Sequence, residues 1–461
     1  MAFKKNQTVI LEVVDINHLG FGVAKPDGFV VFIGGTVPGD TVEARIIKVN
    51  ASYAVARTER LLTPSPHRAD TERCPIRACS ACAYKNVRYA YEKDVKRTSV
   101  IHAFRKAGLS DVAVGELLST EQTTHYRNKA QFPVARRADG GLAIGFFAPK
   151  SHRVCEAAAC PLQPPVFTDI LETIRTFAEA HALTAYDETT GDGWLRHIYL
   201  RRGEVSGEIL LTLVVTDRHF PLASDFVQCV TQAHPAIVGI LLNLQRARTN
   251  VILGDTYLTL FGRDYLTDTL SGVTLSLSAP AFYQVNHDAA ELLYRKAREL
   301  AAPQGDELLL DLYCGAGSIG LSMADAVREV IGIEIVESAV RCAEQNAKQS
   351  GIQNARFFTG DAADAERLLC DAERALGHAI RPDIVILDPP RKGCDERLLT
   401  YIASLAPSRI VYISCNPETL ARDAAHLAPL GYTCGTVTPV DLFPGTGHVE
   451  SVVRLERRLD N

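Results

Sequence analysis

Short runs in which apolar and polar residues alternate fill the first part of the chain. The segments TVILEVVDI, GFVVFIG, DTVEARIIKV and YAVARTERLL, all within residues 6–61, follow the two-residue period of half-buried strands. They are punctuated by Gly20, Gly22, Gly34, Gly35 and Gly39. Short, evenly spaced strands joined by glycine turns predict a small OB-like β-barrel over residues 1–62.

A different rhythm begins at Gly305, where compact apolar runs alternate with helical patterns. The runs ELLLDLYC, REVIGIEI, ARFFTGD, DIVILDPP and RIVYISCN have the length and composition of buried strands. Strands that alternate with helices predict a parallel sheet covered on both faces. Residues 281–461 are therefore predicted to form a Rossmann-like α/β domain.

The segment between these two regions mixes both periods. KAQFPVARR, HIYLRRG and EILLTLVVT are strand-like, whereas FTDILETIRTFAEAHAL has the spacing of an amphipathic helix. A chain of 461 residues is too long for a single core. We expect an α+β middle domain over residues 63–280 and an α/β multidomain protein overall.

Composition narrows the class of protein. No run of about 18 apolar residues is present, and the N-terminus MAFKKNQTVILEVVD lacks the apolar core of a signal peptide. We therefore expect a cytoplasmic protein. In that compartment the 12 cysteines are expected to be metal ligands, nucleophiles or core residues rather than disulfides.

Charge is distributed unevenly around the net value of −5. Residues 1–150 contain 22 Lys and Arg against 14 Asp and Glu, so the rest of the chain is acidic. A basic N-terminal part attached to an acidic remainder favours a segment that binds a polyanion such as nucleic acid. Chance variation in surface charge gives the same balance and stays open as an alternative.

The strand LLLDL is followed by a glycine loop, CGAGSIGL, within residues 308–321. Glycines at such a strand end let the backbone approach a ligand, and the next strand ends in Glu334, which can accept ribose hydroxyls. The choice is between a dinucleotide and S-adenosylmethionine, and the pattern D-x-x-C-G-x-G with a following Glu resembles the first two motifs of class I methyltransferases. S-adenosylmethionine is therefore favoured, with Asp361 and Asp388 at the ends of two further strands of the same sheet.

The segment VYISCNPETL ends an apolar strand on Cys415, held by a rigid Asn-Pro turn. A thiolate that adds to C6 of a pyrimidine makes C5 nucleophilic, and a base must later remove the C5 proton. Glu450, in FPGTGHVESV, is a candidate for that base. The plainer alternatives are an inert buried thiol and a surface carboxylate in a salt bridge.

The motifs YISCNP, DPPRKG, LYCGAGSIG, FYQVN and FPGTGHVESV resemble those of the RNA (uracil-5-)-methyltransferase family, and the N-terminal segment resembles a TRAM domain. The resemblance implies that Cys415 is the nucleophile and Glu450 the proton acceptor, with Arg391 and Asn286 supporting the site. It also implies a set of residues that bind S-adenosylmethionine: Gln284, Tyr313, Gly315, Gly317, Ser318, Glu334, Asp361 and Asp388.

A candidate set of thiolate ligands consists of three clustered cysteines, Cys74, Cys79 and Cys82, and the distant Cys160. Four thiolates hold an iron–sulfur cluster or a structural zinc ion. The resemblance implies a 4Fe–4S cluster, although the gap between the first two cysteines is one residue shorter than the family's pattern. Zinc and the absence of any metal remain as alternatives.

The expected partner is RNA, because a base must be single-stranded or flipped to expose C5. Basic residues near aromatic ones in the middle domain are candidate contacts: Arg127, Lys129, Arg136, Arg137, Arg196 and His197. In its combination of a barrel with a cysteine cluster, the chain resembles those enzymes of the family that act on 23S ribosomal RNA. Transfer RNA is the main alternative substrate, and a non-catalytic RNA-binding or folding protein is the alternative from another class.

Overall fold

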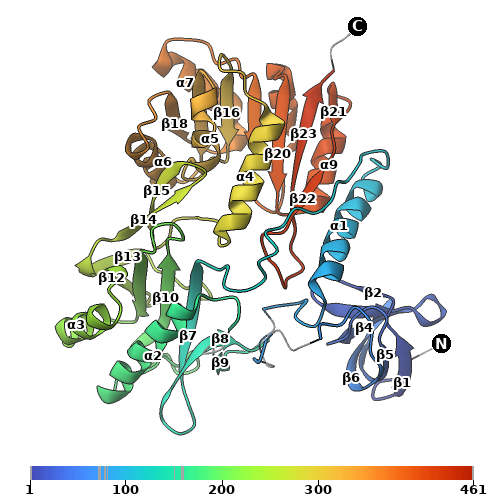
Figure 1. Ribbon diagram of the computed structural model, residues 1–461, viewed down its shortest axis with the longest axis vertical. Helices are drawn as coiled ribbons and strands as arrows, with labels where there is room; N and C mark the ends of the chain where they lie inside the picture. The colour runs from blue at the N-terminus through green and yellow to red at the C-terminus, as the bar shows by residue number, and fades with distance from the viewer. Residues whose placement is uncertain are drawn as a thin grey trace.

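The computed structural model describes residues 3–70, 74–76, 79, 81–149, 151–156 and 160–458. Figure 1 shows an N-terminal sheet, a middle sheet with two helices beside it, and a larger C-terminal sheet flanked by helices. Within the described ranges, no helix is long and apolar enough to cross a membrane.

The N-terminal sheet has the order β1-β5-β6-β4-β3-β2, in which β4 and β6 run parallel and the other pairs antiparallel. Its inward positions alternate along the strands, as in Val31 and Ile33 of β4 or Val42, Ala44 and Ile46 of β5. The elements are β1 (Thr8–Glu12), β2 (Asp15–Ile16), β3 (Phe21–Ala24), η1 (Pro26–Gly28), β4 (Val30–Gly34), β5 (Thr41–Val49) and β6 (Tyr53–Thr63).

The middle sheet has the order β13-β12-β11-β10-β7-β8-β9. Two amphipathic helices pack on one of its faces, where Phe167 and Ile170 meet Phe132 and Leu200 in a common apolar core. The elements are β7 (Lys129–Arg136), β8 (Leu142–Phe147), β9 (Val154–Glu156), α2 (Pro165–Ala180), β10 (Leu195–Arg202), β11 (Ile209–Val215), α3 (Ala223–Ala233), β12 (Ile237–Leu244) and β13 (Thr256–Gly262). The hairpin β14 (Tyr265–Leu270) and β15 (Val273–Ser278) leads to the C-terminal sheet.

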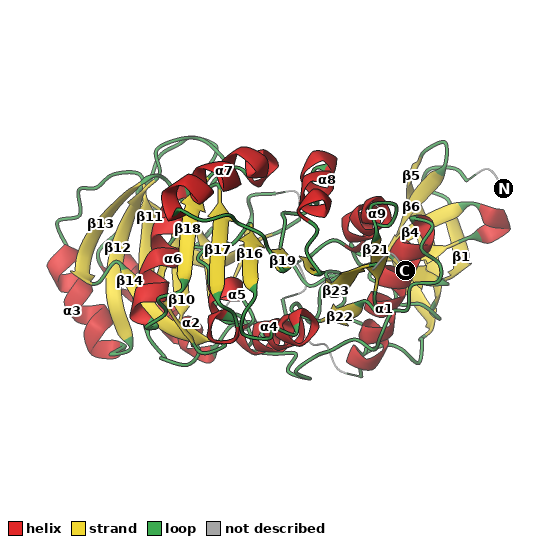
Figure 2. Ribbon diagram, turned by 90° about the horizontal axis from the view of Figure 1, so that it is seen from above, coloured by secondary structure: helices red, strands yellow, loops and turns green. Residues whose placement is uncertain are grey.

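The C-terminal sheet has the order β18-β17-β16-β19-β20-β23-β21, with β22 also paired to β23 (Figure 2). Strands β18 to β20 are parallel, and β23 enters antiparallel between β20 and β21. The strands are β16 (Leu308–Leu312), β17 (Glu329–Glu334), β18 (Ala355–Thr359), β19 (Ile384–Leu387), β20 (Arg409–Ser414), β21 (Tyr432–Cys434), β22 (Thr438–Val440) and β23 (Glu450–Arg457). The strand order reverses between β16 and β19, and ligands bind beside such a switch point.

Helices cover both faces of this sheet, so its parallel strands are buried almost throughout. The helical elements are α4 (His287–Ala301), α5 (Ser318–Leu321), η2 (Ala324–Ala326), α6 (Glu337–Gln349), η3 (Ala362–Asp364), α7 (Ala365–Leu376), α8 (Glu396–Leu405) and α9 (Pro417–Leu427). This arrangement confirms the Rossmann-like α/β fold predicted from the alternating strands and helices.

Helix α1 (Tyr89–Lys106) follows the N-terminal sheet in the chain but packs against the C-terminal one. Figure 1 shows α1 beside α9, and Phe104 shares an apolar core with Leu420. Beyond α1, Val114 and Leu118 form parallel bridges to Val437 and Val440. The predicted boundaries assign this helix to the middle domain, whereas its contacts attach it to the C-terminal sheet.

Candidate active site

The glycine loop follows β16 at the carboxyl edge of the C-terminal sheet. Tyr313, Gly315 and Gly317 all have a positive φ, of 66°, 55° and 79°. For Tyr313 this left-handed conformation is strained, and such strain collects at functional sites. A Cβ placed on Gly315 would meet no atom within 4 Å, so there is open space beside its backbone. The loop therefore offers room for a ligand at the switch point.

Glu334, the last residue of β17, fastens this loop. Its Oε2 accepts a hydrogen bond from the Gly315 amide at 3.1 Å, and its Oε1 accepts one from Val336 at 2.9 Å. The side chain remains partly exposed at the open edge. A carboxylate in this place can accept hydrogen bonds from the ribose hydroxyls of S-adenosylmethionine.

Two carboxyls lie behind the loop, of which Asp311 is buried and Asp388 is partly buried. Asp311 accepts a hydrogen bond from the Gly320 amide at 2.9 Å, and burial raises its pKa to about 8. Burial likewise raises the pKa of Asp388, at the exit of β19, to about 7. Ser318 shares a hydrogen bond of 2.7 Å with the Tyr294 hydroxyl of α4. Sequence reasoning missed Asp311 and Tyr294, whose roles depend on contacts across the fold.

Asp361 and the FYQVN segment complete the predicted cofactor residues. Asp361 is exposed after β18 and accepts a hydrogen bond from Ala363 at 2.9 Å. The Gln284 carbonyl accepts a hydrogen bond from the Asn128 side chain at 2.8 Å. Asn286 caps α4 through Ala289 and donates to the Leu442 carbonyl at 3.1 Å. Asn286 thus joins α4 to the loop that precedes β23.

Phe282 stands in the same segment and is 70% exposed. An exposed aromatic ring near a candidate base-binding site can stack on an unpaired base. From this motif the sequence prediction took Gln284 and Asn286 but not Phe282. The signal that would have found Phe282 is an aromatic residue in a loop with no apolar periodicity around it.

Cys415 follows the last residue of β20 and precedes α9. Asn416 caps that helix by accepting from Glu418 at 3.1 Å, and its amide donates to the Arg391 carbonyl at 3.0 Å. The thiol is half-buried. Burial and the negative charges of Glu450 and Asp388 raise its pKa, whereas the charge of Arg391 and a hydrogen bond from it lower it. The thiol therefore lies at the exit of β20, within electrostatic reach of Arg391, Glu450 and Asp388.

Glu450 is the first residue of β23 and is only 5% exposed. Ser451 pairs with Ser414, the last residue of β20, so Glu450 and Cys415 are the next residues beyond the last pair of the β20–β23 ladder. Burial and the charge of Asp388 raise the pKa of Glu450 to about 8, against the opposing effect of Arg391. A carboxyl with a pKa near neutrality is suited to exchange a proton.

The loop between β22 and β23 is anchored by a buried cluster that we call the Lys96 triad: Glu92, Lys96 and Asp441. The Lys96 ammonium donates to Glu92 at 2.7 Å and to Asp441 at 2.9 Å, and all three side chains are at most 1% exposed. Lys96 also donates to the Phe443 carbonyl at 3.1 Å. The Gly445 amide donates to Glu92 at 2.7 Å. Helix α1 therefore fixes the loop that leads to Glu450.

The four candidate ligand cysteines lie near this anchored loop. Burial, and then the charges of Cys160, Cys74 and Cys79, raise the pKa of the Cys82 thiol to about 12. The four thiols are therefore neighbours, as the sequence spacing predicted, and all are free of disulfides. Within the ranges that the structure describes, no group of three His, Cys, Asp or Glu side chains has the arrangement of a metal site.

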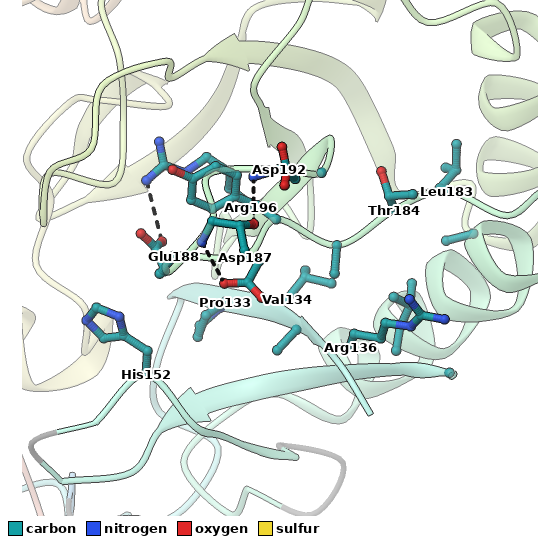
Figure 3. Close-up of a pocket in the computed structure, with 18 of the residues that line it drawn as sticks. Pro133, Val134, Arg136, His152, Leu183, Thr184, Asp187, Glu188, Asp192 and Arg196 are labelled. Carbon is teal, nitrogen blue, oxygen red and sulfur yellow. Dashed lines mark hydrogen bonds and ion pairs between the residues drawn. The ribbon is translucent and has the colours of Figure 1, made fainter. Parts of the chain in front are cut away.

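A cavity of about 980 Å³ lies in the middle domain, apart from these residues (Figure 3). Arg196 lies in its wall, 3.4 Å from Glu188 and with its guanidinium 4.2 Å from the centre of the Tyr186 ring. The residues described as lining it include none of the predicted catalytic or cofactor residues. Since the cavity lies apart from those residues, we assign it no part in the chemistry.

The strand order, the glycine loop and Glu334 define a class I S-adenosylmethionine-dependent methyltransferase. Residues 236–458 match the family described as tRNA (Uracil-5-)-methyltransferase, and residues 3–58 match the TRAM domain. The chain is 36% identical to an uncharacterized RNA methyltransferase of Halalkalibacterium halodurans, over 98% of this chain and 97% of that protein. It therefore belongs to the RNA (uracil-5-)-methyltransferase family.

Two further comparisons agree with this assignment. An uncharacterized RNA methyltransferase of Listeria monocytogenes is 37% identical, over 98% of either chain. The crystal structure of Pyrococcus abyssi tRNA (uracil-54, C5)-methyltransferase in complex with S-adenosyl-L-homocysteine matches with a TM-score of 0.79 at 25% identity. That match covers 97% of this chain and 100% of the other. The predicted family and TRAM domain are confirmed.

Proposed function

We propose that this protein methylates C5 of a uridine in 23S ribosomal RNA, with Cys415 as nucleophile and Glu450 as base. The observation that carries the proposal is that Cys415 and Glu450 lie just beyond the last pair of the β20–β23 ladder, close enough for the charge of Glu450 to raise the pKa of the thiol. Thiol and carboxyl are the two groups that C5 alkylation of a pyrimidine requires. Phe282 is placed to stack on the unpaired base, and Arg391 favours the thiolate.

In this proposal the Cys415 thiolate forms a bond to C6 of the uracil, and the electron pair moves to C5 and O4. When bound, S-adenosylmethionine would supply the methyl group: the electron pair at C5 would form the new C–C bond as the methyl–sulfonium bond breaks, and S-adenosylhomocysteine would leave. Glu450, as carboxylate, then accepts the proton from C5. The electron pair of that C–H bond restores the C5–C6 double bond and expels the thiolate, which leaves 5-methyluridine.

The substrate is tested by incubating the protein and S-adenosylmethionine with unmodified 23S RNA and, in parallel, with unmodified transfer RNA. Nucleoside mass spectrometry should find 5-methyluridine in the ribosomal sample alone. The Pyrococcus protein acts on transfer RNA, so product in that sample alone would keep the chemistry and replace the substrate. RNA binding without product in either sample would favour the non-catalytic alternative.

Replacing Glu450 with Gln should stall the reaction after methyl transfer. The amide cannot accept the C5 proton, so the thiolate cannot leave and a covalent protein–RNA complex accumulates. Loss of the Glu450 charge also removes one of the causes that raise the pKa of Cys415, so attack by the thiol should not be impaired. Denaturing gels with labelled RNA measure the complex.

The control for that trap is the double variant Cys415→Ala with Glu450→Gln, which should form no complex. Normal turnover by Glu450→Gln, with 5-methyluridine released at the wild-type rate, would assign the base to another residue.

We also propose that Cys74, Cys79, Cys82 and Cys160 hold a 4Fe–4S cluster. Four neighbouring thiols supply the ligand set that such clusters and zinc prefer. Methyl transfer needs no electron, so the group would have a structural role. Its place supports this role, since the Cys82 Cβ lies 4.0 Å from where a Cβ on Gly445 would stand.

Protein purified without oxygen should be brown and contain iron and acid-labile sulfide, and both should fall sharply in the Cys82→Ser variant. The matched control is Cys370→Ser, because Cys370 is exposed on α7 and lies outside the four-cysteine group. If the wild-type protein were colourless and contained stoichiometric zinc, the four cysteines would hold zinc and the iron–sulfur proposal would be wrong.

A further inference from the structure

Two cations stand directly opposite each other on neighbouring strands of the middle sheet. Lys129 of β7 pairs in register with Arg201 of β10. Residues paired in this way project from the same face, and like charges placed directly opposite are destabilising. Such a pair lowers the stability of the fold, so its presence suggests that the two cations have a function.

Neither cation is neutralised by a residue that the structure describes. Arg201 is 1% exposed, and its Nη2 donates to the Tyr199 hydroxyl at 3.1 Å and to the Ala281 carbonyl. Its Nε and Nη1 have no hydrogen-bond partner in the described part of the chain, nor does either cation form an ion pair there. Burial and the charges of Arg201 and Arg127 lower the pKa of Lys129 to about 8.

The pair adjoins the candidate active site. Arg201 holds the carbonyl of Ala281, and the Asn128 amide donates to the Val285 carbonyl at 2.9 Å. Between these two contacts lie Phe282 and Gln284. The cations therefore lie beneath the segment that flanks the proposed position of the target base, and Lys129 remains partly exposed.

We propose that Lys129 and Arg201 form a binding site for a phosphodiester of the RNA strand that flanks the target uridine. A phosphate would neutralise two charges that repel each other when the site is empty. Lys129 can contact the phosphate oxygens directly. Arg201, fixed by the Tyr199 hydroxyl and the Ala281 carbonyl, supplies a positive potential behind it. This inference rests on the proposed RNA substrate.

The test uses Lys129→Gln, because a change at the buried Arg201 would endanger folding. The dissociation constant for an RNA loop that contains the target uridine is measured across a range of salt concentrations. Binding should weaken about ten- to hundred-fold. The slope of log affinity against log salt should fall by about one. The thermal midpoint of the free protein should stay unchanged or rise, because a repulsion has been removed.

The matched control is Arg202→Gln, which removes one charge from the neighbouring position on β10. Arg202 points to the other face and lies 3.6 Å from Glu204. If both variants lost RNA affinity equally, the effect would come from the change in net charge alone, and the proposal would be wrong. An unchanged salt slope in Lys129→Gln would also contradict it.

A second measurement identifies the ligand. RNAs that carry one uncharged methylphosphonate linkage are scanned along the loop. One linkage should weaken binding to the wild type and have no further effect on Lys129→Gln, because the contact is already lost. If Lys129→Gln changed the affinity for inorganic phosphate but not for RNA, the site would bind a free anion and the proposal would fail.

Failure of the proposed function gives a different result from failure of this site. A wild-type protein that neither binds nor methylates RNA contradicts the proposed function. A wild-type protein that methylates RNA, with Lys129→Gln indistinguishable from it in affinity and salt slope, contradicts only the phosphodiester site.

Discussion

Replacing Cys415 with alanine should abolish 5-methyluridine formation, with a loss of about 10⁴- to 10⁶-fold in rate, the scale seen when an enzyme loses its nucleophile. Without the bond to C6, C5 of uracil does not become nucleophilic enough to take up a methyl group. Because the thiol is half-buried and lies outside the apolar cores, its loss should change RNA affinity and thermal stability little.

The rate is measured as methyl transfer from labelled S-adenosylmethionine under single-turnover conditions. Cys370→Ala serves as the control, since that thiol is exposed on α7. Residual activity of Cys415→Ala within about tenfold of the wild type, which is only about 1.4 kcal/mol, would exclude a covalent mechanism through this residue.

Replacing Lys96 with methionine should destabilise the protein by about 3–5 kcal/mol, the cost of leaving a buried partner charge uncompensated. Both Glu92 and Asp441 are buried against this ammonium, at 2.7 and 2.9 Å. Thermal or denaturant unfolding measures the change. Because the triad anchors the loop before Glu450, the remaining folded protein should also lose turnover more than RNA affinity.

The matched control is Lys93→Met, one turn earlier on the same helix. Lys93 forms an ion pair of the same length, 2.7 Å, with Glu121, but its side chain is 28% exposed and that of Glu121 is 65% exposed. Exposed pairs contribute about 0–1 kcal/mol, so this variant should stay close to the wild type. If both changes destabilised the protein equally, burial of the Lys96 triad would not be the cause of its contribution to stability.

The pH dependence of the Lys96→Met variant follows from the direction of a pKa shift. Burial raises the pKa of Glu92 above its ordinary value even in the presence of Lys96. A raised carboxyl pKa means that the folded state binds more protons than the unfolded one, so stability falls as pH increases. Without the ammonium this effect should strengthen. The deficit of the variant should be smallest at acidic pH and grow as the pH rises.

Much of the C-terminal domain could be predicted because its signals are local. The alternation of apolar runs with helical segments identified the parallel sheet, and the glycine loop with Glu334 located its carboxyl edge. Cys415 was placed correctly at the end of a strand because the Asn-Pro turn follows it directly. Chemistry then led to Glu450, since a thiol that attacks C6 requires a base nearby.

The Lys96 triad could not be predicted in this way. Glu92 and Lys96 have the spacing of an ordinary exposed ion pair on a helix, and the pattern predicts nothing more. Their burial results from Asp441, far away in sequence, which packs onto α1. Tyr294 and Ser318 pose the same problem, as does the pairing of Lys129 with Arg201. Contacts between distant segments leave no trace in local periodicity.

The insertion of β23 between β20 and β21 has a consequence for synthesis on the ribosome. β20 can pair with β19 as soon as it emerges, but its other edge, like β21, reaches its final neighbour only when β23 is available. Until then β20, which is buried along its whole length in the finished fold, is an apolar edge open to other chains. The nascent protein can thus complete its glycine loop early, yet stay exposed to aggregation until Glu450 arrives with β23.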